Sequence, residues 1–418
     1  MNKEKESVSK FNFIMGILHG MFYSGGIAFG SSTTVLPAFF ANFTSSKILI
    51  GLSSSITGEI GSLGNILPQL FVASKIEHRI HKRPLLRFAI TVRALCWGLL
   101  ALVTYLFAGN NAGLTLAVLF LLLFLFTFMG GVATVPFMDI WGRTIPSNLR
   151  GRFFGYRQLL GGFLAVLSGF TVNFILNNSR ISFPANYALL FLLAFILITI
   201  SYFALGSVKE TITEVHKEQL SFYDFVGKAF DILKNNSNYR KFLVIQILSG
   251  AIALSLPFFV LYAKDVLQIK IGMIGVFLSA QMLGLMLSNI IWGHLSDSLG
   301  STKVIQFSIL FGMLAPLFVL ILPHNFPNLF VILFVFLGCF ISGRVIGKNA
   351  FLLDIASDKD RPRYISLEGS FRLPVVFFPL IGGMLIQRSS YEILFAITGL
   401  LLTGAFILSF GLEEPRKS

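Results

Sequence analysis

Glu59 is the only charged residue between Lys47 and Lys75, inside a long apolar stretch. At a rise of about 1.5 Å per residue it falls about 17 Å into a helix, near the middle of a membrane. Ionisable side chains at that depth are costly and by default face a cavity or a partner. We therefore expect Glu59 either to bind and release a proton or to contact a bound solute. The alternative is a carboxyl that only hydrogen-bonds neighbouring helices.

Polar side chains recur at helical spacing around this carboxylate. Positions three and four residues apart share one helix face, and this face carries Ser55, Glu59, Ser62, Asn65 and Gln69. The equivalent positions of the second half of the chain are Gln281 and Ser288. We expect Ser62, Gln69 and Gln281 to line one central cavity.

Two cations stand one helical turn apart in the tenth apolar segment. Arg344 lies about 24 Å from the outer end of that segment, deeper than a residue of the membrane interface, whereas Lys348 could reach the cytoplasm. Arg344 is predicted to bind an anionic group or to balance Glu59. The alternative is a structural ion pair with Asp354 or Glu368.

A few further polar residues lie inside apolar runs. His19 is a lesser candidate for the cavity, because a lone histidine in a membrane often only hydrogen-bonds a neighbour. Arg93 is expected to anchor its helix at the cytoplasmic interface. Cys96 and Cys339 have neither a disulfide framework nor metal-ligand spacing, so we expect no metal site.

The segments that hold these residues are long and apolar. The chain is 55% hydrophobic and 12% charged, about half the charged fraction of a soluble protein. Short polar gaps split it into hairpins at 47, 109–113, 177–180, 264–270, 323–328 and 387–392. Only helices satisfy their backbone hydrogen bonds within each segment in lipid. The fold class is therefore predicted to be all-α, with twelve transmembrane helices in two pseudo-symmetric six-helix bundles.

Positive charge is unevenly distributed between the two ends of the segments. All but five of the 33 Lys and Arg residues lie at one end, the exceptions being Lys47, Arg180, Lys264, Lys270 and Arg388. Such an excess marks the cytoplasmic side. We expect a multi-pass protein of the cytoplasmic (inner) membrane with both termini in the cytoplasm. The net charge of +14 then belongs to loops that face anionic lipids, and no nucleic-acid partner is expected.

The predicted bundles comprise residues 1–207 and 242–418. The cytoplasmic linker between them, 208–241, contains apolar residues at the spacing of an amphipathic helix on the membrane surface: Phe222, Phe225, Val226, Phe230 and Leu233. We expect the chain to work as a monomer.

A loop motif follows the eighth predicted segment and reads G-H-L-S-D-S-L-G-S-T-K from Gly293 to Lys303. Gly293 is expected to permit a close helix approach and Gly300 a tight turn. Asp297 can accept hydrogen bonds from a helix N-terminus or an arginine, which would hold a cytoplasmic gate shut.

The equivalent loop of the first half, residues 74–83, is a degenerate copy of this motif. His78 stands at the position of the aspartate. An ion pair of Asp139 with Arg79 or Arg83 is expected to supply the missing contact. The alternative is that these are ordinary charges at the membrane interface.

This loop motif resembles the loop signature of the major facilitator superfamily, and the similarity of the paired hairpins covers the whole chain. The resemblance implies a secondary active transporter whose two bundles rock about a central site, with the tenth helix lining it. No cofactor is implied beyond an ion gradient. A proton is the expected coupling ion, because carboxyl and histidine are the titratable groups available.

The predicted function is movement of a small organic solute by alternating access, in a direction that the sequence leaves open. The fifth segment lacks the Gly-Pro step of drug/proton antiporters, but efflux of drugs or metabolites remains an alternative, as does a non-transporting receptor or scaffold of the same fold. An enzyme is not expected, since neither a phosphate-binding glycine loop nor a nucleophile or metal constellation is present.

Overall fold

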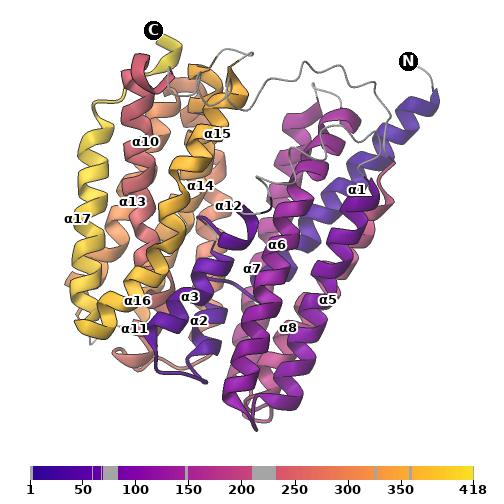
Figure 1. Cartoon of the computed structure of the whole chain (residues 1–418), viewed down its shortest axis with the longest axis vertical. Helices are drawn as coiled ribbons and strands as arrows, with labels where there is room; N and C mark the ends of the chain where they lie inside the picture. The colour runs from indigo at the N-terminus through magenta and orange to yellow at the C-terminus, as the bar shows by residue number, and fades with distance from the viewer. Residues whose placement is uncertain are drawn as a thin grey trace. The chain divides into compact units, whose positions relative to one another are not determined.

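The computed structural model describes the chain except residues 1, 2, 59, 67, 69–82, 146–148, 210–231, 324–326, 357–359 and 418. Within the described part every secondary-structure element is a helix (Figure 1). Ten of the described helical segments are long and apolar enough to cross a membrane, and Lys47–Thr57 is a shorter apolar helix. The predicted all-α membrane fold is confirmed.

The described residues form two compact units. Unit 1 consists of Met1–Ser45, Ser53–His216 and Ile269–Ser279, and unit 2 of Ser46–Leu52, Lys217–Gln268 and Ala280–Ser418. Two short segments are thus grouped with the other half of the chain. Segment Ser46–Leu52 is grouped with unit 2 because Lys47 contacts that unit: its Nζ lies 2.6 Å from Asp265 Oδ2. Segment Ile269–Ser279 is grouped with unit 1 because Asn173 of that unit donates to the Gly272 carbonyl over 2.8 Å.

Unit 1 is built of α1 (Lys3–Ala28), α2 (Val35–Phe40), the second part of α3 (Lys47–Thr57), α5 (Arg83–Phe107), α6 (Ala112–Thr144), α7 (Arg150–Asn177) and α8 (Ala185–Ser207). Helix α1 packs on α7 and α8, and α5 packs on α6 and α8. The turn predicted at 109–113 is present, and Asn111 caps α6 by accepting from the Leu114 N–H.

The first apolar run is not one helix. Helix α1 ends at Ala28 and α2 begins at Val35, with a buried polar segment between them. In this segment the Ser31 hydroxyl bonds the Thr33 hydroxyl and accepts from the Thr33 N–H. Such local bonds compete with the helical hydrogen bonds, which explains why the helix stops here.

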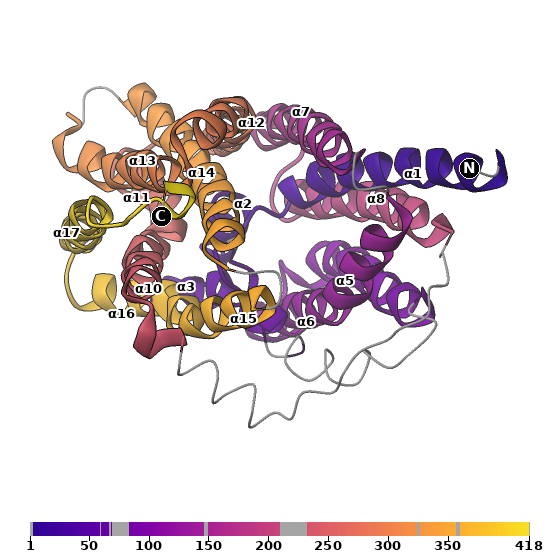
Figure 2. The ribbon, with the colours of Figure 1, turned by 90° about the horizontal axis from the view of Figure 1, so that it is seen from above.

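Unit 2 contains α10 (Ser237–Ser249), η2 (Gly250–Leu254), α11 (Leu256–Asp265), most of α12 (Met273–Leu299), α13 (Ser301–Ile321), η3 (Pro327–Phe330), α14 (Val331–Ile355), α15 (Arg361–Phe371), η4 (Leu373–Phe377), α16 (Phe378–Arg388), α17 (Tyr391–Ser409) and η5 (Pro415–Lys417). Helix α13 packs against α14 and α17, as the view along the helices shows (Figure 2). The 3-10 stretches η2 and η4 interrupt the seventh and eleventh apolar segments. Prolines just after η2, within η4 and in α16 remove backbone donors there.

An asparagine ties the first helix of each half to the end of its sixth. Asn12 donates to the Lys209 carbonyl and accepts from the Lys209 N–H, both over 2.9 Å. Asn238 makes the same two bonds with Glu413, over 2.9 and 3.0 Å. The internal repeat read from the sequence therefore extends to single hydrogen bonds.

Candidate functional site

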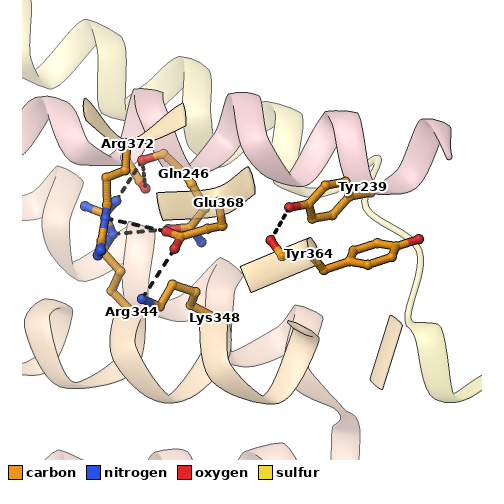
Figure 3. Close-up of polar contacts among 8 residues, drawn as sticks. Tyr239, Gln246, Arg344, Lys348, Tyr364, Glu368 and Arg372 are labelled. Atoms are coloured by element: carbon orange, nitrogen blue, oxygen red, sulfur yellow. Dashed lines mark hydrogen bonds and ion pairs between the residues drawn. The ribbon is translucent and has the colours of Figure 1, made fainter. Parts of the chain in front are cut away.

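A cluster of charged side chains lies inside unit 2, between α10, α14 and α15 (Figure 3). We call it the Glu368 cluster, and it consists of Gln246, Arg344, Lys348, Glu368 and Arg372. The spacing of four residues in each of two helices places Arg344 with Lys348, and Glu368 with Arg372, on shared faces. One turn of α14 and the last turn of α15 thus place three cations near the carboxylate of Glu368.

Glu368 is the centre of this cluster and is only 3% exposed. Its Oε2 lies 3.8 Å from Lys348 Nζ, and its Oε1 lies 3.6 Å from Arg372 Nε. Arg344, 8% exposed, donates from Nη2 to the Gln246 carbonyl over 2.8 Å and from Nε to its side-chain oxygen over 3.3 Å. Both ion pairs of Glu368 are longer than direct hydrogen bonds.

The cluster carries more positive than negative charge. Its three cations surround one carboxylate, and Arg344 Nη1 has no hydrogen-bond partner among the described residues. Buried charge is costly unless it is paired and hydrogen-bonded. An additional anion would therefore be stabilised here, and the planar guanidinium of Arg344 suits a carboxylate or phosphate.

An aromatic contact fixes α15 against α10, one turn before Glu368. The Tyr239 hydroxyl donates to the Tyr364 carbonyl over 2.6 Å, and the two rings lie 4.5 Å apart between centroids (Figure 3). Phe242 stacks on Phe351 of α14 at 4.4 Å. This packing holds the three helices together, so that the cluster is built on rigid elements.

Of the tenth segment's cations, Arg344 is buried and Lys348 partly buried, and one of the two partners considered for Arg344 is wrong. Asp354 pairs with Arg416 over 2.9 Å and therefore does not balance Arg344. Lys348 reaches Glu368. Sequence reasoning missed the roles of Gln246 and Arg372. The available signal was an acid followed four residues later by an arginine at the start of an apolar segment.

The continuous polar stripe predicted along the second segment is wrong. Helix α3 ends at Thr57, and Ser62 is buried in a non-helical stretch, where its hydroxyl donates to the Ile56 carbonyl. Gly58 and Gly61 flank the break, and glycine is a poor helix former. Glu59 and Gln69 lie outside the described residues. Gln281 is fully buried in α12.

His19 is buried in unit 1. Its Nδ1 lies 2.6 Å from the Ser201 hydroxyl, which in turn donates to the His19 carbonyl over 2.8 Å. Arg93 was expected at the membrane interface, and that expectation is wrong. It points into the unit and donates to the Tyr23 hydroxyl over 2.8 Å, because its long side chain reaches the rings of α1 and α6.

The loop motif of unit 2 is only partly as expected. Gly300 makes the predicted tight turn with φ at +96°. The predicted close approach at Gly293 is wrong, since a Cβ there would meet nothing within 4 Å. Asp297 is exposed, with no hydrogen bond or ion pair to the described residues, and Lys303 donates to Gln306 over 2.9 Å. Their role in a gate stays a prediction.

Glu414 accepts the hydrogen bonds from a helix N-terminus that the sequence analysis expected Asp297 to accept. Its Oε2 accepts from the Thr302 N–H over 2.9 Å and its Oε1 from the Ser301 hydroxyl over 3.3 Å, at the N-terminus of α13. A carboxylate is stabilised there by the helix dipole. The acid that caps this helix thus comes from the far end of the chain.

The ion pair predicted for the first half cannot be located within the described part of the chain. Arg83 donates to the Gly206 carbonyl at the end of α8 over 2.9 Å. Arg79 and the side chain of Asp139 lie outside the described residues, so their pairing stays a prediction. Among the described residues no group of three or more His, Cys, Asp or Glu could hold a metal ion.

Comparison with known proteins shows which family and which fold the chain resembles. Residues 241–418 match the family model of the Major Facilitator Superfamily. The whole chain is similar in structure to a mutant form of the nucleoside transporter NupG, with a TM-score of 0.73, 13% sequence identity and coverage of 97% of this chain and 100% of that one. The second half of the chain is thus similar to the Major Facilitator Superfamily, and the whole chain has the fold of NupG.

Two further transporters of known structure share this fold. The D-xylose-proton symporter has a TM-score of 0.71 at 14% identity, covering 97% of this chain and 98% of its own. A POT family transporter in complex with 5-aminolevulinic acid has a TM-score of 0.67 at 13% identity, covering 97% and 95%. At such identities the likeness concerns the fold alone. No curated protein sequence is significantly similar to the chain.

Proposed function

We propose that this protein is a transporter of the major facilitator superfamily, a secondary active carrier for a small organic solute that bears a negative charge. The observation that carries the proposal is the surplus of positive charge in the Glu368 cluster, where one buried and two partly buried cations surround one buried carboxylate. The carrier would alternate between inward and outward access as a monomer in the cytoplasmic membrane, driven by protons.

The long ion pairs of Glu368 give this cluster a way to link solute and proton. An incoming carboxylate or phosphate would bind the Arg344 guanidinium and draw Lys348 and Arg372 away from Glu368. Glu368 could then accept a proton in place of its cations. One negative charge and one proton would enter together, which keeps the buried charge constant.

Flux into proteoliposomes tests this coupling. We expect the purified protein to accumulate an anionic solute, found by a ligand-stabilisation screen, when a pH gradient is imposed. Arg344→Gln should weaken binding of that anion by about tenfold or more and leave a neutral analogue unaffected. Equal binding of the anion by both proteins would remove Arg344 from the solute site.

Glu59 stays a second proposed coupling group. Glu59→Gln should abolish accumulation driven by the gradient but leave exchange of labelled for unlabelled solute intact, because exchange needs no net proton movement. Exchange is therefore the matched control for folding. Accumulation equal to the wild type between about pH 6 and 8 would assign coupling to another carboxyl. The direction of net flux under the natural gradient would decide between uptake and efflux.

A further inference from the structure

Unit 1 encloses a cavity that the Glu368 cluster does not share. Its volume is about 180 Å³, and it lies among α1, α5, α6, α7 and α8. The polar and aromatic side chains that line it are His19, Tyr23, Arg93, Phe137, Arg157 and Tyr202. All of them belong to unit 1.

The charged groups on the wall of this cavity are cations. Two of its described lining residues are arginines and none is a carboxylate. The guanidinium carbon of Arg93 lies 4.3 Å from the centroid of the Phe126 ring, and that of Arg157 lies 5.0 Å from the centroid of Phe137. Aromatic faces orient a guanidinium and attract it, but they leave its full charge in place.

Two polar atoms at this wall are available to a ligand. The Tyr202 hydroxyl and Arg93 Nε have no hydrogen-bond partner among the described residues. Tyr202 is only 5% exposed, and buried polar groups are normally hydrogen-bonded. Both atoms are donors suited to an anionic oxygen.

The internal repeat explains how unit 1 came to lack an acid at this place. Phe153 packs on Phe13 with ring centroids 5.5 Å apart, as Tyr364 packs on Tyr239 in unit 2. Arg157 follows Phe153 by four residues, as Glu368 follows Tyr364. Where unit 2 holds its carboxylate, unit 1 therefore holds a guanidinium.

We propose that this cavity binds a small organic carboxylate with a ring-sized apolar body. Arg93, Arg157 and the Tyr202 hydroxyl would hold the carboxylate, while Tyr23 and Phe137 pack on the ring. A cavity of about 150 Å³ accommodates benzene in a protein interior, so 180 Å³ suits one ring with a small charged group. This site is separate from the Glu368 cluster and goes beyond the proposed function, because binding here requires neither Arg344 nor transport.

Isothermal titration of the purified full-length protein with benzoate tests this assignment. We expect binding of benzoate and not of benzamide, its neutral analogue. Arg157→Gln and Arg93→Gln should each weaken it about tenfold or more. Tyr202→Phe should weaken it several-fold, and it keeps the ring packing, so that folding is preserved. The matched control is Arg180→Gln, at an exposed residue outside the helices, which should bind like the wild type.

Several results would overturn the proposal. They are the absence of benzoate binding, equal binding of benzamide, unchanged binding in all three cavity variants, and tighter binding of phenyl phosphate. Loss of benzoate binding in Arg344→Gln alone would place the ligand in unit 2 instead. If binding depends on Arg157 and yet no pH gradient drives flux, the site stands and the proposed transport function fails.

Discussion

At the scale of single residues, Glu368 is the carboxylate whose charge acts on both Arg344 and Lys348. Glu368→Gln would leave the buried Arg344 and the partly buried Lys348 and Arg372 without their counter-ion. Breaking a buried ion pair by removing one partner costs about 3–5 kcal/mol. We therefore expect a marked fall in the thermal midpoint of the purified protein.

The double variant Glu368→Gln with Arg372→Gln is the matched control for this effect. It removes one cation together with the acid, so part of the lost stability should return. Additive effects of the two substitutions would show that the side chains do not interact, and the ion-pair cluster would lose its basis.

The sequence revealed one side of this cluster but not the other. Arg344 and Lys348 were found because cations inside an apolar segment are rare. Glu368 lies in the last turn of α15 and was named only as an alternative partner of Arg344, because a charge beside an apolar segment is ordinary at a membrane interface. Its burial depends on how α15 packs on α10, which the spacing of residues does not encode.

At the scale of elements, the turn between α12 and α13 depends on one glycine. Gly300 has a positive φ, and a Cβ there would collide with the Glu414 carboxylate. Gly300→Ala should therefore destabilise the protein by about 1–3 kcal/mol, seen as a lower thermal midpoint. Gly293→Ala is the control: it lies in the same motif, in open space, and should be neutral or slightly stabilising. Equal losses in both would contradict this account.

Glu414 should also make stability depend on pH. Burial would raise the pKa of its carboxyl, but hydrogen bonds from Thr302 and Ser301 outweigh burial and hold the pKa below the ordinary value of 4.5. Since the folded pKa is the lower one, the stabilisation is complete above about pH 4.5 and is lost as the pH falls through the folded value.

Replacing this carboxyl isolates its contribution. Thermal midpoints of the wild type and Glu414→Gln should differ most near neutral pH and converge once the pH has fallen below the folded pKa, because the acid is then protonated in both states of the wild type. A difference that stays constant across this range would mean that the glutamate acts through packing and not through its charge.

Helix ends were predictable from the sequence where polar turns separate apolar runs, as between α5 and α6. Breaks inside the runs were not. Helix α3 stops before Ser62, and 3-10 turns interrupt the seventh and eleventh segments. Glycine and proline weaken a helix locally, yet Pro136 and Pro316 lie inside unbroken helices. Tertiary packing therefore decides which of these residues ends a helix.

At the scale of the whole molecule, the uneven distribution of Lys and Arg predicts which side of the membrane each turn faces. A single cysteine at Asn110, in the turn between α5 and α6, should react with a membrane-impermeant reagent added outside the cell. Cys96 and Cys339 would first be replaced by serine. Labelling of Asn110→Cys only after the cells are opened would reverse the topology and place both termini outside.

The whole fold was more accessible to sequence reasoning than either site. Apolar length gives the helices and the internal repeat gives the two halves, whereas the grouping of 46–52 with unit 2 arises from contacts of Lys47 with residues far along the chain. The cavity of unit 1 was missed for the same reason: Arg93, Arg157 and Tyr202 come from three different helices.

The three tryptophans of the chain are divided between the units. Trp97 and Trp141 belong to unit 1 and Trp292 to unit 2, where its indole N–H donates to the Cys339 carbonyl over 3.1 Å. Trp141 also lies 5.9 Å from Phe137 between ring centroids. A protein with Trp292→Phe would thus fluoresce from unit 1 alone, and its emission would follow the occupancy of one half of the carrier without any added dye.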